Sequence, residues 1–248
     1  MDKVALVTGA SGGIGRAVAA LAARDGYAVA LACRSNPEKA QAVARHIQEG
    51  GGHAVTVEAD LSRESDIVSL FERVHTDLGR LDALVNNAGI IGWEGRVDQA
   101  SADQLNHLWA VNLTSYYICC REGIRRMSTL HGGAGGSIVN VSSLSGRTGG
   151  RDRRVHYAAS KAAINTLTLG LAKEVATEDV RVNAVLPAFT ATEIHDDYGG
   201  EKRAEKIAQT IPMQRVAQAE EVAEAVLWLL SDKASFSTGV LMDVAGGS

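Results

Sequence analysis

The sequence has few cysteines and prolines, and its cysteines form no recognisable pattern. They are Cys33, Cys119 and Cys120, an odd number without the spacing of a metal site. We expect buried free thiols of the kind found in the reducing cytoplasm, with a redox role for one of them as the alternative. No metal site is expected.

Long apolar runs and an excess of positive charge are also absent. No run reaches the roughly 18 apolar residues of a membrane span. The N-terminal stretch MDKVALVTGA lacks the basic and then apolar pattern of a signal peptide. The formal net charge is −4, so no basic field favours nucleic acid or an anionic membrane. We therefore expect neither of these as a partner.

What the sequence contains instead is a regular alternation of apolar runs and helical segments. Strands are predicted at 3–8, 27–33, 53–59, 81–87, 137–143, 180–187 and 240–244. Helices are predicted at 16–26, 37–49, 63–78, 101–129, 155–177, 201–210 and 219–231. Continuous apolar runs are typical of strands buried on both faces of a parallel sheet. The alternation predicts one α/β domain over 1–248, with a doubly wound, seven-stranded parallel sheet and helices on both faces.

A glycine-rich turn, TGASGGIG at 8–15, lies between the first strand and the first helix. In this context such a turn indicates dinucleotide binding. Glycines permit positive φ and close approach of the backbone, and the helix N-terminus favours the negative charge of a pyrophosphate. The glycines at 9, 13 and 15 depart from the G-x-G-x-x-G spacing, so a purely structural turn is the alternative.

The end of the second strand bears on which dinucleotide is bound. NAD-binding units place an acidic residue there for the ribose 2′-hydroxyl, whereas an arginine accommodates a 2′-phosphate. Here the strand is followed by Arg34, Ser35 and Asn36, with no acid. This favours NADP(H), unless Arg34 is only a solvated loop residue.

The helix predicted at 155–177 opens with VHYAASKAAIN, in which Tyr157 and Lys161 lie one helical turn apart. A free tyrosine has a pKa of about 10. An ammonium about 4 Å away is worth roughly 4 kcal/mol at an effective dielectric constant of about 20, enough to bring that pKa near 7. The pair is therefore a candidate acid–base catalyst, although a surface tyrosine resting on a lysine stem has the same spacing.

Taken together, these motifs resemble those of the classical short-chain dehydrogenase/reductase family. The resemblance extends from the first strand to Gly247, and the shared residues are TGASGGIG at 8–15, Asp60, NNAG at 86–89, Asn112, Ser143, YAASK at 157–161, Asn183 and Pro187. It implies a Rossmann fold, a nicotinamide cofactor and a carbonyl or secondary-alcohol substrate. Within the family the chain resembles 3-oxoacyl-[acyl-carrier-protein] reductases and related sugar and alcohol dehydrogenases.

The resemblance also implies catalytic roles. Tyr157 would donate the proton to the substrate oxygen, and Ser143 would hydrogen-bond that oxygen. Ser143 is preferred to Ser142 because the family's serine stands three residues before a glycine. Lys161 would lower the tyrosine pKa and hold the nicotinamide ribose. Asn112 would position a water that links Lys161 to solvent, although an asparagine inside an apolar helix could instead cap a kink.

The residues implied to hold the cofactor follow the same motifs. They are Gly9, Ser11, Gly13, Ile14 and Gly15 in the phosphate-binding turn, Arg34 at the 2′-phosphate, Asp60 and Leu61 at the adenine, Asn87, Ala88 and Gly89 at the adenosine side, Tyr157, Lys161 and Pro187, and Thr192 near the nicotinamide amide.

Several features depart from the family pattern. Gly12 stands where many NADP-dependent relatives carry a second arginine, which leaves more of the phosphate to Arg34. Ala188 stands where the family usually has glycine, and the loop before the catalytic helix is one residue longer than in 3-oxoacyl reductases. The segment 177–179, Thr-Glu-Asp, replaces an arginine with which those reductases grip an acidic carrier. Its two carboxylates would repel such a carrier, which disfavours a fatty-acid substrate.

The loop before the catalytic helix carries a basic cluster that consists of Arg147, Arg151, Arg153, Arg154 and His156. It could attract an anionic substrate; a solvated face or a subunit contact is the alternative. Trp93 and Phe189 are expected to border the pocket unless they serve only core packing. Residues 188–212 are expected to form a substrate loop.

The hypothesis that follows is an NADP(H)-dependent oxidoreductase acting on a carbonyl compound or secondary alcohol. One alternative is an NAD-linked sugar or polyol dehydrogenase, which Arg34 disfavours. Another is a non-catalytic NADP(H)-sensing protein, which the intact catalytic set disfavours. Relatives commonly pair through the helices at 101–129 and 155–177, so a homotetramer (or homodimer) is expected. The identity of the substrate, the direction of the reaction and its stereochemistry have no readable code in the sequence.

Overall fold

A computed structural model describes residues 3–193 and 200–248 of the chain. These described residues form seven strands: β1 (Lys3–Thr8), β2 (Tyr27–Cys33), β3 (Ala54–Glu58), β4 (Leu81–Asn86), β5 (Gly136–Val141), β6 (Val180–Pro187) and β7 (Leu241–Val244). They lie in one sheet in the order β3-β2-β1-β4-β5-β6-β7, and all neighbouring strands are parallel. The predicted seven-stranded, doubly wound sheet is confirmed.

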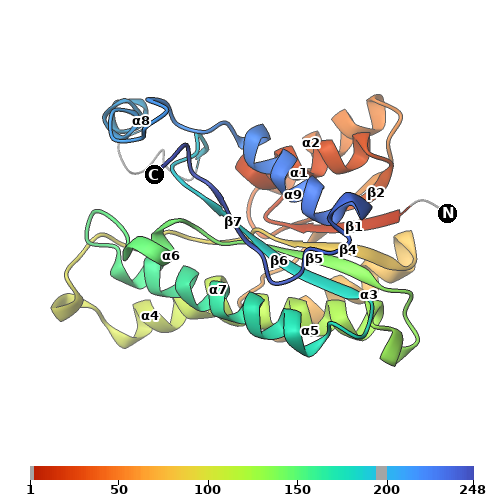
Figure 1. Ribbon diagram of the computed structural model, residues 1–248. Coiled ribbons are helices and arrows are strands. Elements are labelled where there is room, and N and C mark those ends of the chain that lie inside the picture. The colour runs from red at the N-terminus through yellow and green to blue at the C-terminus, as the bar shows by residue number, and fades with distance from the viewer. Residues whose placement is uncertain (1–2, 194–199) are drawn as a thin grey trace.

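Helices cover both faces of the sheet (Figure 1). One face carries α1 (Gly13–Arg24), α2 (Pro37–Glu49) and α9 (Ala219–Leu230). The other carries α3 (Glu64–Leu78), α5 (Ser115–Met127) and α7 (Val155–Glu174), with α4 (Ala102–Trp109) beside α7. Two short helices, α6 (Ser145–Thr148) and α8 (Gly200–Ala208), follow the carboxyl ends of β5 and β6. Among the described helices, none combines the length and the apolarity that a membrane crossing requires.

The strands bury side chains on both faces, as their continuous apolar sequences predict. In β1, Ala5 and Val7 pack under α1 and α9, whereas Val4 and Leu6 face α3 and α5. Each face has its own apolar cluster, and the side chains of both clusters are buried. Burying apolar surface on two sides stabilises each central strand and fixes its register, because a one-residue slip would exchange the two faces.

The helix predicted at 101–129 is interrupted. A π-helical turn at Ala110–Thr114 separates α4 from α5. Such turns place one extra residue in a helix and occur frequently at functional sites. The turn carries Asn112, whose side chain bonds Ile90 and Ser160 and does not cap the turn, contrary to the alternative of a kink cap.

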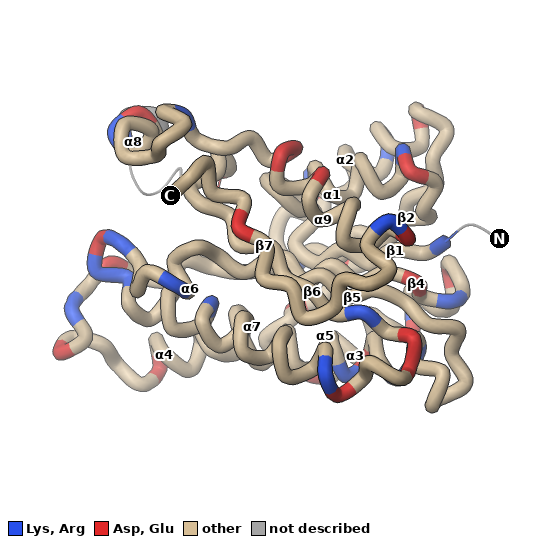
Figure 2. The backbone as a smooth tube through the Cα atoms, in the orientation of Figure 1, with Lys and Arg blue, Asp and Glu red and all other residues tan. Residues whose placement is uncertain are grey.

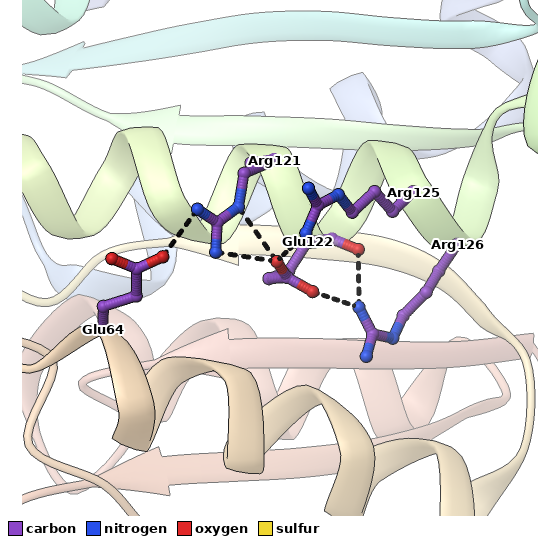
Figure 3. Close-up of polar contacts among 5 residues, drawn as sticks. All are labelled: Glu64, Arg121, Glu122, Arg125 and Arg126. Carbon is purple, nitrogen blue, oxygen red and sulfur yellow. Dashed lines mark hydrogen bonds and ion pairs between the residues drawn. The ribbon is translucent and has the colours of Figure 1, made fainter.

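An ion-pair network centred on the buried Glu122 connects α5 to α3 (Figure 3). Glu122, 3% exposed, accepts hydrogen bonds from Arg121, Arg125 and Arg126 at 2.7–3.0 Å. Arg121 also reaches Glu64, at the start of α3, at 2.7 Å. Burial alone would raise the pKa of Glu122, but the hydrogen bonds from Arg126 and Arg121 outweigh it and hold the pKa below its usual range. The network supports the packing of α5 against α3.

Candidate active site

A cavity of about 1060 Å³ opens at the carboxyl ends of the strands. The strand order reverses between β1 and β4, and ligands of open α/β sheets bind at such a switch point. Most of the predicted site residues line it: Gly9, Ser11, Gly13, Ile14, Arg34, Asp60, Leu61, Asn87, Ala88, Gly89, Ser143, Tyr157, Lys161, Pro187 and Thr192. Two others, Gly15 and Asn112, are not part of the lining.

The glycines of the turn after β1 are required by close contacts. Gly9 has a φ of 65°, and a Cβ on Gly15 would lie 2.3 Å from the carbonyl oxygen of Gly9. The Asn87 amide connects the turn to the segment after β4, because its Nδ2 donates hydrogen bonds to the carbonyls of Thr8 and Gly9 at 2.9 and 3.1 Å. Gly15 and Asn87 therefore set the shape of the turn, whatever else they contact.

A carboxylate occupies the hydrogen-bonding position of this turn. Oε2 of Glu193 accepts a hydrogen bond from the Gly13 N–H at 3.0 Å, and Arg16 lies 3.6 Å from Oε1. A hydrogen bond from its own backbone N–H, together with Arg16 and Gly13, holds the pKa of Glu193 below its usual range. The N-terminus of α1 therefore binds an anionic oxygen in this structure. A pyrophosphate would present the same kind of oxygen, so the turn fits a dinucleotide.

Two cations line the cavity after β2. Arg34 is exposed at the end of the strand, and Lys39 comes from the first turns of α2. Asp60 lines the same cavity. Its Oδ1 accepts hydrogen bonds from the Ser62 hydroxyl and the Ser62 N–H at 2.7 and 3.0 Å. The Ser62 hydroxyl, with a smaller effect of Arg34, lowers the pKa of Asp60. Sequence reasoning missed Lys39, although a cation five residues after Arg34 at a helix start was a usable signal.

Asn112 fixes the segment after β4 by hydrogen bonds to the backbone of Ile90. Its Oδ1 accepts from the N–H of Ile90 at 2.8 Å, and its Nδ2 donates to the carbonyl of Ile90 at 2.8 Å and to the Ser160 hydroxyl at 3.2 Å. The side chain is fully buried and its polar atoms all have partners. It therefore fixes Ile90, which lines the cavity, and joins the π-helical turn to α7.

The two serines that end β5 are in different environments. The Ser142 hydroxyl is buried and donates within the fold, to the Lys161 carbonyl at 3.0 Å or the Asn165 side chain at 2.7 Å. The Ser143 hydroxyl accepts from the N–H of Ser145 at 3.1 Å, lines the same cavity as Tyr157, and lowers the pKa of the Tyr157 phenol. Ser143 is thus the serine placed beside the tyrosine, which is the arrangement expected from the sequence.

Tyr157 and Lys161 both line the cavity from the first turns of α7, with Nζ of Lys161 5.9 Å from the centre of the phenol ring. Their pKa values differ from the sequence expectation. Burial raises the pKa of Tyr157, against the lowering effect of the Ser143 hydrogen bond. Burial also lowers the pKa of Lys161 to about 7. The lysine does not bring the tyrosine pKa near 7 here, because desolvation penalises the charged form of both groups.

The basic loop before α7 does not act as one cluster. Arg147 pairs with Asp243 at 3.3 Å, and Arg154 is buried against Glu94 and Asp152 at 3.5 and 3.6 Å. Figure 2 shows both signs of charge along this loop, beside α6. Arg153 is exposed and is not part of the cavity lining. Only Arg151 and Arg154 of the four arginines line the cavity.

The substrate side of the cavity is formed by segments far apart in the sequence. Arg203 of α8 lines it and ion-pairs with Asp152, and its guanidinium lies 5.8 Å from the ring centre of Phe189. Phe189 lines the cavity as expected, but Trp93 does not: it stacks on His156 at 3.7 Å. Part of the predicted loop 188–212, residues 194–199, lies outside the described residues.

One departure from the family pattern has a simple structural explanation. Ala188 follows β6, and its N–H donates to the carbonyl of Val244 at 3.0 Å. It is not among the described residues with positive φ, so alanine needs no strained backbone at this position.

Comparisons with known proteins agree with this geometry. A family model described as enoyl-(acyl carrier protein) reductase matches residues 9–248. The uncharacterized oxidoreductase YgfF of Escherichia coli is 48% identical over 98% of this chain and 99% of its own length. The cis-4-hydroxycyclohexanecarboxylate dehydrogenase of Sinomonas cyclohexanicum is 37% identical over 99% of this chain and 96% of its own.

A solved structure has the same fold. A dehydrogenase/reductase from Sinorhizobium meliloti superimposes with a TM-score of 0.91 at 32% identity, covering 99% of this chain and 94% of that one. The motifs, the sheet order and these relatives agree over nearly the full length. The chain belongs to the classical short-chain dehydrogenase/reductase family, whose members are oxidoreductases that use a nicotinamide cofactor and small-molecule substrates.

Proposed function

We propose that this enzyme is an NADP(H)-dependent reductase of carbonyl compounds, or a dehydrogenase of the corresponding secondary alcohols. The observation that carries the proposal is the meeting of Ser143, Tyr157 and Lys161 in the cavity that the glycine turn borders. A protein that only sensed the dinucleotide would have no need for a serine hydroxyl beside a half-buried phenol.

The proton chemistry follows from the two shifted groups. The carbonyl carbon would receive a hydride from the reduced nicotinamide when that cofactor is bound, and the carbonyl oxygen, which gains negative charge, would then need a proton. Tyr157, whose pKa is raised by burial, is protonated at neutral pH and suits a donor. Ser143 would stabilise the developing negative charge by hydrogen bonding. Lys161, with a pKa of about 7, would return a proton to the tyrosine after each turnover.

The residues proposed for the cofactor divide into three groups. Gly9, Ser11, Gly13, Ile14 and Gly15 form the phosphate-binding turn; Asp60, Leu61, Asn87, Ala88 and Gly89 surround the adenosine; and Pro187, Thr192, Tyr157 and Lys161 hold the nicotinamide end. Asn112 would fix the cavity wall at Ile90, next to Lys161. It would also position a water that links Lys161 to solvent.

NADP(H) is favoured over NAD(H) by the charges after β2. Arg34 and Lys39 line the cavity there, and Lys39 offers the second cation that Gly12 does not provide. A 2′-phosphate carries about two negative charges and pairs well with such groups. An acid that would select the 2′-hydroxyl is missing from residues 34–36.

Fewer of the basic residues in the loop before α7 could bind an anionic substrate than the sequence suggested. Arg151, exposed and hydrogen-bonded to Thr210 at 3.0 Å, lines the substrate side with Arg154 and Arg203. The Sinomonas relative is named for a substrate that bears a carboxylate on a cyclohexanol. We extend that chemistry to this chain as a second proposal: a hydroxy or oxo acid whose carboxylate lies near Arg151.

The resemblance to the family extends the proposal to the domain, the assembly and the cellular location. Residues 1–248 would form one catalytic domain with its substrate loop at 188–212, and four chains (or two) would assemble through the helical segments 101–129 and 155–177. The described cysteines are all free and buried, which suits the cytoplasm.

The test follows the absorbance of NADPH, and separately of NADH, with ketones, diketones, sugars, 3-oxoacyl thioesters and cyclic oxo acids. Turnover with NADPH is expected on at least one class of carbonyl. A preference for NADH would refute the role given to Arg34. Tight NADPH binding without turnover on any compound would instead support a sensor. Equal Michaelis constants for cyclic oxo acids in the wild type and in Arg151→Ala would refute the anionic-substrate proposal.

A further inference from the structure

Lys161 has a neighbour that none of the family motifs includes. Tyr116, on the first turn of α5, is 1% exposed. Its hydroxyl lies 3.4 Å from Nζ of Lys161 and donates a hydrogen bond to the carbonyl of Val141 at 3.1 Å. The same carbonyl accepts from Nζ of Lys161 at 2.8 Å. Three polar groups from α5, β5 and α7 thus meet at one point.

The ring of Tyr116 is anchored independently of this hydroxyl. It packs with Ile164 and Leu167 of α7, and with Leu113 of the π-helical turn. Because a phenylalanine ring could make these apolar contacts, packing alone does not explain the hydroxyl. A hydroxyl buried at this depth needs hydrogen-bond partners, and those it has are the strand carbonyl and the catalytic lysine.

We infer that Tyr116 is a positioning residue for Lys161: its hydroxyl accepts a hydrogen bond from the ammonium and holds Nζ at the end of β5, beside Ser143 and Tyr157. The inference rests on the proposed function of this site. Tyr116 itself is not part of the cavity lining, so it acts through the lysine and touches neither substrate nor cofactor.

The charged form of the lysine depends on few groups. Tyr157 faces it from its own helix and Tyr116 from α5, with Cys119 and Cys120 behind Tyr116. The segment after β4 and the π-helical turn bring Gly89 and Asn112 near it, neither of which titrates. Among the described residues, no carboxylate shifts the pKa of Lys161, and burial is the cause that lowers it.

Removing the Tyr116 hydroxyl should therefore destabilise the protonated form of Lys161 and lower its pKa. A hydrogen bond to an ion is worth about one pKa unit. The Lys161 pKa in Tyr116→Phe should fall from about 7 by roughly that amount. The alkaline limb of the kcat profile should move down equally, with kcat about fivefold lower at pH 7 and changed less than about twofold at pH 5.5. The substrate KM should stay within about twofold, since no cavity residue changes.

The experiment compares Tyr116→Phe with Tyr117→Phe, which removes the hydroxyl of the neighbouring tyrosine, 52% exposed. Activity is measured from pH 5 to 9. In parallel, the Lys161 pKa is measured by NMR on protein with ¹³C-labelled lysine, the signal being assigned with Lys161→Gln. A lower Lys161 pKa in Tyr116→Phe alone supports the inference. An unchanged pKa, or an activity loss that is uniform across pH, overturns it and assigns Tyr116 a packing role.

A measurement on the wild type keeps the inference testable if Tyr116→Phe folds poorly. With ¹³C label on the tyrosine ring carbon that bears oxygen, the Tyr116 signal should shift with the same midpoint as Lys161, and the Tyr117 signal should not. A Tyr116 signal that ignores the lysine titration overturns the inference. Both NMR readouts are independent of turnover, so they separate its failure from failure of the proposed function.

Discussion

The carboxylate of Glu193 accepts a hydrogen bond from the backbone N–H of Gly13 across 180 residues of sequence, at 3.0 Å. This contact puts a negative charge at the N-terminus of α1, where the pyrophosphate of a dinucleotide is proposed to bind. The carboxylate and a phosphate would compete for the same donor. If the pyrophosphate binds at this turn as proposed, Glu193 must leave it.

Glu193→Gln should consequently bind NADPH more tightly. Removing a negative charge close to the phosphates is worth about 1 kcal/mol, or roughly a fivefold lower Kd. Fluorescence titration measures the constant, and Glu224→Gln on α9, which loses an exposed acid paired with Arg24, should leave it unchanged. An equal or higher Kd in Glu193→Gln would mean that the carboxylate does not compete.

The preference for NADP(H) depends on the cations after β2. Arg34→Ala should raise the Kd of NADPH about 10- to 100-fold, because a hydrogen bond to a charged group is lost, and should leave the Kd of NADH nearly unchanged. Lys39→Ala should act in the same direction with a smaller effect. Arg45→Ala, an exposed position on α2, is the matched control. Equal losses for both dinucleotides would argue against recognition of the 2′-phosphate.

Stability should depend on the buried carboxylate of Glu122. Glu122→Gln leaves three arginines without their shared anion and should lower the free energy of unfolding by about 2 kcal/mol at neutral pH. Glu64→Gln, which removes a carboxyl that is 61% exposed, should cost less than about 1 kcal/mol. Urea denaturation at pH 7 compares the two variants.

The Glu122 effect should also depend on pH, with a definite sign. The folded-state pKa of Glu122 lies below its usual value, so its stabilisation is fully present above the unfolded pKa of about 4.3. It is lost as the pH falls through the lower folded-state value. The difference between wild type and Glu122→Gln should therefore shrink below about pH 4. A difference that stays constant down to the acid transition would contradict an ionised Glu122.

The sequence predicts the sheet well because continuous apolar strands and glycine turns are local signals. It also predicts that Ser143, Tyr157 and Lys161 lie at one site, and all three line the cavity. The family motifs fix their spacing in the sequence. It does not predict the π-helical turn, which no residue type marks. Nor does it predict the Glu193 contact, which depends on how the segment after β6 folds back onto the turn after β1.

The error over the Tyr157 pKa has a different origin. The sequence estimate used only the attraction between an ammonium and a phenolate at an assumed distance. In the fold both groups are desolvated, and Nζ of Lys161 is engaged by the Val141 carbonyl at 2.8 Å. Burial is a property of the whole tertiary structure, so the sign of the shift could not be read from two residues in one helix.

The most direct measurement is the single-turnover reduction of a responsive carbonyl substrate by Tyr157→Phe with bound NADPH. We expect the rate to fall by a factor of about 10³ or more, since general acid catalysis contributes about 10² to 10⁴. The Kd of NADPH should change less than about threefold, within the range of a lost weak contact, and Tyr117→Phe should keep full activity. A Tyr157→Phe variant that binds NADPH normally and reduces the substrate within about tenfold of the wild-type rate would contradict the assignment of Tyr157 as the proton donor.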